Sequence, residues 1–237
     1  MEIVNLILSA LSQGMLYAPM AMGVFIAFKI LNTPDLTIDG SLVFGMTVCA
    51  VVTIAGHPVL ALVAGTAAGA VAGLITGLQQ TKLQINAILA GILTMTGLYT
   101  VNYMVLGGQA NLYLQHAELN ESGSEVFVSS NTIYKMFASL FPSWDNTVAV
   151  LVLTALLVAA VAALLCVFFK TRPGMAIRAT GDNEEMVRSS SINADMSRVL
   201  GIMIANALVA LSGSLLCQQQ RYADLNSGSG VLVVGLA

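Results

Sequence analysis

The carboxylates Asp35 and Asp39 have the clearest potential for chemistry in this sequence, because they stand at the start of an apolar run. Carboxylates inside a membrane are costly to bury and usually serve a function. If the segment is helical, their spacing of four places both on one helix face, with Thr37 and Ser41 between or beside them. These four side chains would then line a solute path. Alternatively, both carboxylates lie at the interface beside Lys29 and cap the second membrane helix.

Two further polar residues, Asn86 and Asn102, fall in the fourth apolar run and are weaker candidates for the same path. Single polar residues in membrane spans often hold helices together instead. The sequence has no Gly-x-x-x-x-Gly-Lys-Ser/Thr phosphate loop, no Cys-x-x-Cys pair and no His with a partner at metal-ligand spacing. We therefore expect no catalytic site, no metal and no cofactor, and any ATP hydrolysis must occur on a separate subunit.

The composition defines the elements that must position these residues. The chain is 57% hydrophobic and only 9% charged, whereas soluble domains average about 25% charged residues. Lipid offers no hydrogen-bond partners, so spans must be helices or a closed barrel. Long runs rich in Ala, Leu and Val exclude the alternating pattern of a barrel. The sequence predicts an all-α, polytopic helical membrane protein.

About six full or partial spans are expected. The second run is only about 15 residues long, whereas a full crossing needs about 20, so we expect the segment from Thr33 to enter the membrane as partly unwound backbone. Pro19 should kink the first span. A further apolar run begins at Val231, and the chain is expected to end inside it. The expected spans cover residues 4–28, 41–55, 58–78, 85–106, 147–169 and 199–217.

The third span carries a regular row of glycines with a period of four residues. Small residues at this spacing line one helix face and let another helix backbone approach closely. The row predicts tight helix packing and not a phosphate site. It consists of Gly65, Gly69, Gly73 and Gly77.

Charge predicts the topology. Residues 170–198 hold five of the nine basic residues, and Lys/Arg-rich loops face the cytoplasm. Lys82 belongs on the same side. The acidic loop 107–146 then lies outside, where Tyr134, Phe137, Phe141 and Trp144 suggest a short amphipathic helix at the interface.

The basic loop 170–198 has internal order. Arg172-Pro173-Gly174 is expected to form a turn. Asp182 or Asn183 is expected to cap a short helix over about residues 183–190, whose first turn holds two glutamates that suit the helix dipole. Asn193-Ala194-Asp195 is expected to begin the next span.

Two motifs resemble a known family. The segments RPGMAIRATGDNEEMVRSSSINADMSRVLG and LNTPDLTIDGSLVFG resemble the permeases of bacterial ABC importers, in the branched-chain amino acid and ribose permease superfamily. The segment LNTPDLTIDGSLVFG is typical of a subfamily associated with amino-acid-like substrates, particularly tryptophan and tyrosine. The resemblance covers all 237 residues as one transmembrane permease domain. One departure is Ser191, where relatives often carry Gly before Ile-Asn.

The resemblance implies a role for the loop and a set of partners. The short helix would be a coupling helix that fits a groove on an ABC ATPase subunit. Further partners would be an extracytoplasmic solute-binding protein and a second permease copy, forming a homodimer in the lipid bilayer of a bacterial cytoplasmic (inner) membrane. The expected ATPase contacts are Gly181, Asp182, Asn183, Glu184, Glu185, Met186 and Arg188.

An alternative hypothesis is an ion-coupled secondary transporter that uses Asp35 and Asp39 as a broken-helix site. It leaves the ordered basic loop without a role. The resemblance implies an amino-acid-like solute, and the subfamily resemblance implies an aromatic amino acid. No pocket motif in the sequence identifies the solute.

Overall fold

The computed structural model describes residues 2–119, 125–140, 146–190 and 192–236, and this part of the chain is almost wholly helical. Within it, six helical segments are long and apolar enough to cross a bilayer. The expected all-α membrane architecture is confirmed. The spans are Leu6–Ile30, Thr37–Ile54, Pro58–Thr81, Ala87–Val105, Thr147–Phe168 and Ala194–Gln220.

The first span is interrupted where the sequence predicts it. It consists of α1 (Glu2–Leu16), α2 (Ala18–Phe25) and the π-helix η1 (Ile26–Ile30). Pro19 lies in the first turn of α2, where its missing N–H costs no intrahelical bond. After η1, residues 31–36 are not helical although Leu31, Thr33 and Asp35 are buried. This is the expected unwound entry to the second span.

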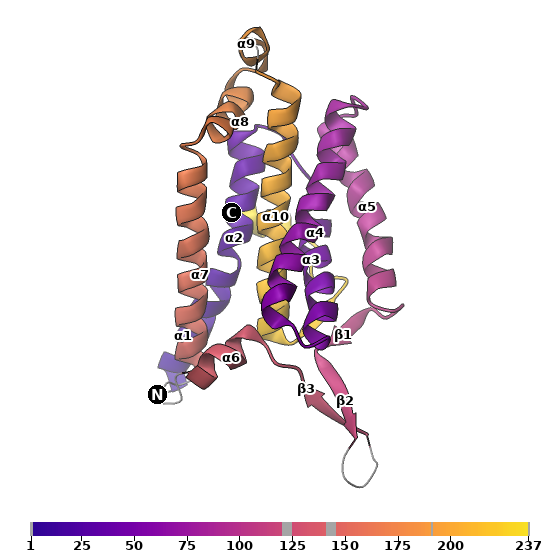
Figure 1. The fold of residues 1–237 in the computed structure, drawn as a ribbon, viewed down its shortest axis with the longest axis vertical. Helices are drawn as coiled ribbons and strands as arrows, with labels where there is room; N and C mark the ends of the chain where they lie inside the picture. The colour runs from indigo at the N-terminus through magenta and orange to yellow at the C-terminus, as the bar shows by residue number, and fades with distance from the viewer. Residues whose placement is uncertain (1, 120–124, 141–145, 191, 237) are drawn as a thin grey trace.

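Three helices form the core of the bundle. The long helix α10 (Ala194–Gln220) packs against α3 (Thr37–Ile54) and α4 (Pro58–Thr81), and it lies near the middle of the molecule (Figure 1). The four glycines of α4 face α10 at close range. At Gly69, an added Cβ would come 2.5 Å from the carbonyl oxygen of Asn206. The small residues therefore allow the two backbones to approach.

Two helices flank this core. In Figure 1, α5 (Ala87–Val105) lies on the side of α3, and α7 (Asn146–Phe168) lies on the opposite side, near α1 and α2. Both expose apolar side chains along their length, as helices facing lipid do.

One end of the bundle carries short strands that the sequence analysis did not predict. Strand β1 (Asn111–Tyr113) pairs antiparallel with β4 (Tyr222–Asp224), and β2 (Gln115–Leu119) pairs with β3 (Glu125–Ser129). Helix α6 (Ile133–Leu140) follows and includes Tyr134 and Phe137, as the aromatic spacing predicts. Phe141 and Trp144 lie outside the described residues.

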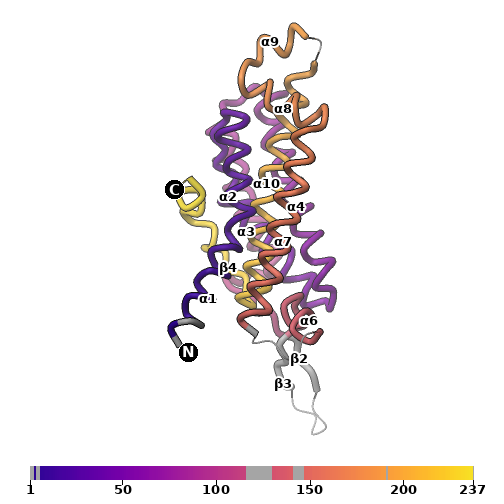
Figure 2. The backbone as a smooth tube through the Cα atoms, turned by 90° about the vertical axis from the view of Figure 1, so that its left-hand side faces the viewer, coloured from indigo at the N-terminus to yellow at the C-terminus, as the bar shows by residue number. Residues whose placement is uncertain are grey.

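The opposite end carries two short helices, α8 (Arg172–Asp182) and α9 (Glu184–Ser189). The turn expected at Arg172-Pro173-Gly174 is wrong, because Pro173 falls in the first turn of α8, where proline is favoured. The turn at Ser191 lies outside the described residues. A last helix, α11 (Val231–Leu236), lies beside α2, about midway along the bundle (Figure 2).

Candidate functional site

Asp35 is buried completely in the unwound segment before α3. One carboxylate oxygen accepts the backbone N–H of Thr37 at 2.9 Å, and the other accepts the side-chain amide of Asn206 at 2.7 Å. The oxygen of the same Asn206 amide accepts the Ser41 hydroxyl at 2.6 Å. Asn206 of α10 therefore bonds both to Asp35, which precedes α3, and to Ser41, which lies within α3.

A second link extends this arrangement to α4. The hydroxyls of Thr37 and Thr76 lie 2.8 Å apart, and both residues are fully buried. Helices α3, α4 and α10 thus share one hydrogen-bonded set of polar side chains, which we call the Asp35 network. Its members are Asp35, Thr37, Ser41, Thr76 and Asn206.

The location of Asp35 corrects one expectation. Asp35 and Asp39 do not share a helix face, because α3 begins at Thr37 and Asp35 precedes it. Asp35, Thr37 and Ser41 have no exposed area in this structure. In this structure all three are hydrogen-bonded within or between helices, and their place on a solute path stays a prediction.

Asp39 faces a different environment. Its carboxylate accepts the backbone N–H of Leu232 at 2.8 Å and that of Gly230 at 3.4 Å, at the start of α11. It also lines a cavity of about 250 Å³ between α3, α5 and the segment before α11. Other lining residues are Met95, Thr96, Tyr99, Asn102, Asn226 and Ser229.

The two asparagines of the fourth span have different roles. Asn102 lines this cavity and also accepts the Thr47 hydroxyl at 3.2 Å, so it connects α5 to α3 as well. Asn86 is exposed and caps α5, since its side chain accepts the Ile88 N–H at 3.0 Å. Asparagine is among the preferred helix N-caps, and a place for Asn86 on the solute path stays a prediction.

The short helix α9 is capped as the sequence predicts. The Asn183 side chain accepts the Met186 N–H at 3.1 Å. Asp182, the other candidate cap, is instead the last residue of α8. Asn193 likewise caps α10 by accepting the Met196 N–H at 3.0 Å.

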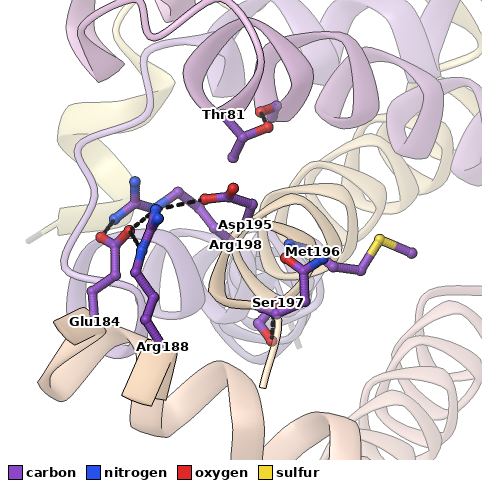
Figure 3. Close-up of polar contacts among 9 residues, drawn as sticks. Thr81, Glu184, Arg188, Asp195, Met196, Ser197 and Arg198 are labelled. Carbon is purple, nitrogen blue, oxygen red and sulfur yellow. Dashed lines mark hydrogen bonds and ion pairs between the residues drawn. The ribbon is translucent and has the colours of Figure 1, made fainter. Parts of the chain in front are cut away.

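Four charged side chains join α9 to the first turns of α10 (Figure 3). Arg188 lies 2.8 Å from Glu184 and 2.9 Å from Asp195, and Arg198 pairs with the second Glu184 oxygen. We call these four residues the ion-pair cluster. The three ion pairs given for the described part of the chain all lie within this ion-pair cluster.

The ion pairs shift the titration of their members. The hydrogen bond from Arg188, with the nearby charges of Arg188 and Arg198, holds the pKa of Glu184 below its usual range. The same hydrogen bond and the charge of Asp195 raise the pKa of Arg188. Both pKa shifts favour the charged forms of Glu184 and Arg188.

Helix α8 is fitted closely against the end of the first span. A Cβ at Gly181 would overlap the carbonyl oxygen of Ile30, the last residue of η1. The Ile177 side chain of α8 is 1% exposed. It and Leu31 both pack against the surface left bare by Gly201 of α10. Helix α8 therefore packs against both η1 and α10.

Several residues of these sites were not singled out from the sequence. Asn206 and Thr76 are lone polar residues in apolar helices, and that isolation is the only signal they give. Asp195 and Arg198 look like an ordinary helix start, and only the fold brings them to Glu184.

These features define a class of protein. The described part of the chain is a bundle of membrane-spanning helices with a charged helical loop at one end, and the described residues contain no group of His, Cys, Asp or Glu that could hold a metal. This architecture is that of a multi-pass helical membrane protein.

The family follows from comparison with known proteins. A family described as the branched-chain amino acid transport system permease component matches residues 6–237, and the chain belongs to this family. A tyrosine transport system permease protein of Clostridioides difficile (strain R20291) is 35% identical over 232 residues, covering 98% of this chain and 70% of that protein. No solved structure matches the chain.

Two further relatives are more distant. An uncharacterized protein of Rickettsia prowazekii (strain Madrid E) is 31% identical over 232 residues, covering 98% of this chain and 75% of that protein. The autoinducer 2 import system permease protein LsrC of Yersinia pestis (strain Pestoides F) is 28% identical over 169 residues, covering 71% of this chain and 42% of that protein. The chain is thus a multi-pass permease subunit of an ABC importer, which leaves the ion-coupled alternative without support.

Proposed function

We propose that this permease pairs with a second copy, binds ABC ATPase subunits at the end that carries α8 and α9, and receives an amino-acid-like solute from a binding protein at the opposite end. The orientation rests on charge, since basic loops face the cytoplasm and α8 and α9 carry Arg172, Arg178 and Arg188. Lys29 lies in η1, which contacts α8. Lys82 caps the end of α4 that packs against the first turns of α10, next to α9. The membrane is then the bacterial cytoplasmic membrane. The tyrosine transport relative supports an aromatic amino acid as the solute.

The observation that carries the proposal is the two-sided character of α9. Val187 is 4% exposed and anchors the helix, whereas Met186 is 67% exposed at the tip of the molecule. Glu184 and Arg188 hold α9 to α10 through the ion-pair cluster. One side of the helix is therefore attached to the bundle, and the other side, with Met186 and Glu185, is free for an ATPase groove.

A contact route leads from this helix into the membrane. Movement of α9 acts on α10 through the ion-pair cluster, and movement of α8 acts on η1 through Gly181. Both α10 and the segment after η1 contribute to the Asp35 network. The network would transmit the displacement to α3, whose Asp39 borders the cavity.

The cavity beside Asp39 is our candidate for one wall of the solute path. It combines a carboxylate, the amides of Asn102 and Asn226, and the ring of Tyr99. A carboxylate and amides suit the charged groups of an amino acid, and an aromatic ring suits an apolar side chain. Asp39 and Asn102 therefore remain proposed path residues, whereas Asp35, Thr37 and Ser41 are proposed to position them.

The test is a charge placed on the free side of α9. In the assembled transporter in vesicles, we expect Met186→Glu to reduce both solute uptake and binding-protein-stimulated ATP hydrolysis by roughly thirtyfold, because a buried unpaired charge at an interface costs on the order of 2 kcal/mol.

Met175→Glu is the matched control. Met175 lies on the neighbouring α8 and is 53% exposed, so the same charge there should change both activities by less than about twofold. Equal effects of the two variants, with equal amounts of protein in the membrane, would remove α9 from the ATPase contact.

A further inference from the structure

An apolar groove lies between the first span and α7, away from the sites described above. Its volume is about 720 Å³, and it extends along α2, η1 and α7 to Arg178 in the middle of α8. Figure 2 looks onto this side of the bundle, where α2 and α7 run next to each other. The apolar walls include Met22, Phe25, Ile26, Leu165 and Phe169.

Two cations mark one end of the groove. Lys170, just after α7, and Arg178, on α8, are both lining residues and both exposed. All ion pairs recorded among the described residues use Arg188 or Arg198, so neither Lys170 nor Arg178 has a carboxylate partner there. The groove therefore has an apolar length and an unneutralised basic mouth.

We propose that this groove binds an anionic phospholipid, with its acyl chain along α2 and α7 and its phosphate at Lys170 and Arg178. Basic pockets between membrane helices bind acidic head groups, and each Lys or Arg near the surface adds to the attraction. Arg adds a planar pair of donors that matches a phosphate. A zwitterionic lipid fills the apolar length equally well but gains much less from the two cations.

The position of the groove gives the lipid a consequence. Arg178 belongs to α8, whose Gly181 fits against Ile30 of η1, and Ile30 itself lines the groove. A bound phosphate would therefore join the ends of α7 and α8 at the point where α8 touches the first span.

Cys166 provides a site-specific probe, because it lines the groove and is exposed whereas Cys49 and Cys217 are buried. A small fluorophore is attached to Cys166 of the full-length protein in vesicles. Quenching by phosphatidylglycerol with brominated acyl chains is then compared with quenching by equally brominated phosphatidylcholine at the same mole fraction. We expect severalfold stronger quenching by phosphatidylglycerol, and less difference at high salt.

The variant Lys170→Gln/Arg178→Gln should lose most of this severalfold preference for phosphatidylglycerol, because it removes both cations that line the groove. Lys29→Gln/Lys82→Gln removes two exposed positive charges at the same end but outside the groove, and it should keep the preference. The proposal fails if the unaltered protein shows no preference, or if both double variants lose it equally. It also fails if neither lipid quenches, as expected when a polypeptide segment fills the groove.

Discussion

Two groups of polar side chains hold α10 in place, and they differ mainly in their exposure to solvent. In the Asp35 network, Asp35 and Asn206 have no exposed area. In the ion-pair cluster, the side chains of Glu184 and Arg188 are 29% and 57% exposed. Both groups connect α10 to another part of the chain, but the Asp35 network is fully buried whereas the ion-pair cluster is partly exposed to solvent.

The difference follows from the cost of losing a partner. A buried polar group left without its hydrogen bond costs about 1–3 kcal/mol, and a buried charge costs more. Exposed ion pairs contribute about 0–1 kcal/mol and weaken in salt. The network therefore fixes three helices relative to one another, whereas the cluster is a weak link that can be rearranged when a partner binds. The comparison separates the rigid part of the permease from the part suited to receive motion.

The largest effect should come from removing the centre of the network. Asn206→Ala leaves one Asp35 oxygen and the Ser41 hydroxyl without partners in a buried site. We expect a loss of about 3 kcal/mol in the free energy of unfolding, measured by thermal or denaturant unfolding in detergent micelles.

Asn102→Ala is the matched control for this variant. Asn102 is also an asparagine buried to 1% exposure, but Thr47, its one recorded donor, keeps a second bond to the Phe44 carbonyl. We expect a loss of about 1 kcal/mol there. Equal losses at the two positions would mean that the Asp35 carboxylate gains nothing from Asn206.

An intermediate effect is expected where the network depends on helix spacing. Gly69→Ala places a Cβ 2.5 Å from the Asn206 carbonyl oxygen, so α4 must move away from α10. Overpacking of this kind costs about 1–3 kcal/mol. Gly14→Ala in α1 has nothing within 4 Å of the new Cβ and should be neutral or stabilise by up to about 1 kcal/mol. In the same detergent, Gly69→Ala should therefore lower the Tm, whereas Gly14→Ala should leave the Tm unchanged or raise it slightly.

The comparison also shows what could be predicted from the sequence. Local composition and spacing predict the spans, the break at Pro19 and the cap at Asn183. All three agree with the structure. The helix start at Arg172 was missed because Arg-Pro-Gly also suits a turn, and the choice depends on Gly174 packing against the end of α7.

The polar sites could be predicted only in part, for a related reason. Asp35 and Asp39 are separated by four residues, and a continuous helix would put them together. The unwound segment before Thr37 sends Asp35 to Asn206, 171 positions away in sequence, and leaves Asp39 to the start of α11. No local pattern encodes a partner at that separation. The pairing of β1 with β4 was missed for the same reason, since Asn111 pairs with Asp224 far along the chain. The pair β2–β3 is local in sequence, so this reason does not apply to it.

The smallest effect on stability is expected at the ion-pair cluster. Glu184→Gln keeps the side-chain shape but removes the charge that faces Arg188 and Arg198. Since these groups are partly exposed, we expect a loss below about 1 kcal/mol, which high salt should largely remove. The measurement is thermal unfolding of Glu184→Gln and the unaltered protein at low and high salt.

The pH dependence of this loss has a definite sign. The pKa of Glu184 is lowered in the folded protein, chiefly by the Arg188 hydrogen bond. Its contribution is therefore present above the ordinary glutamate pKa of about 4.3 and disappears as the pH falls through the lower folded-state value. The stability difference between the two proteins should close below that pH. A salt-independent loss as large as that of Asn206→Ala would instead make the cluster a second rigid joint, and α9 would then have to move together with α10 as one body.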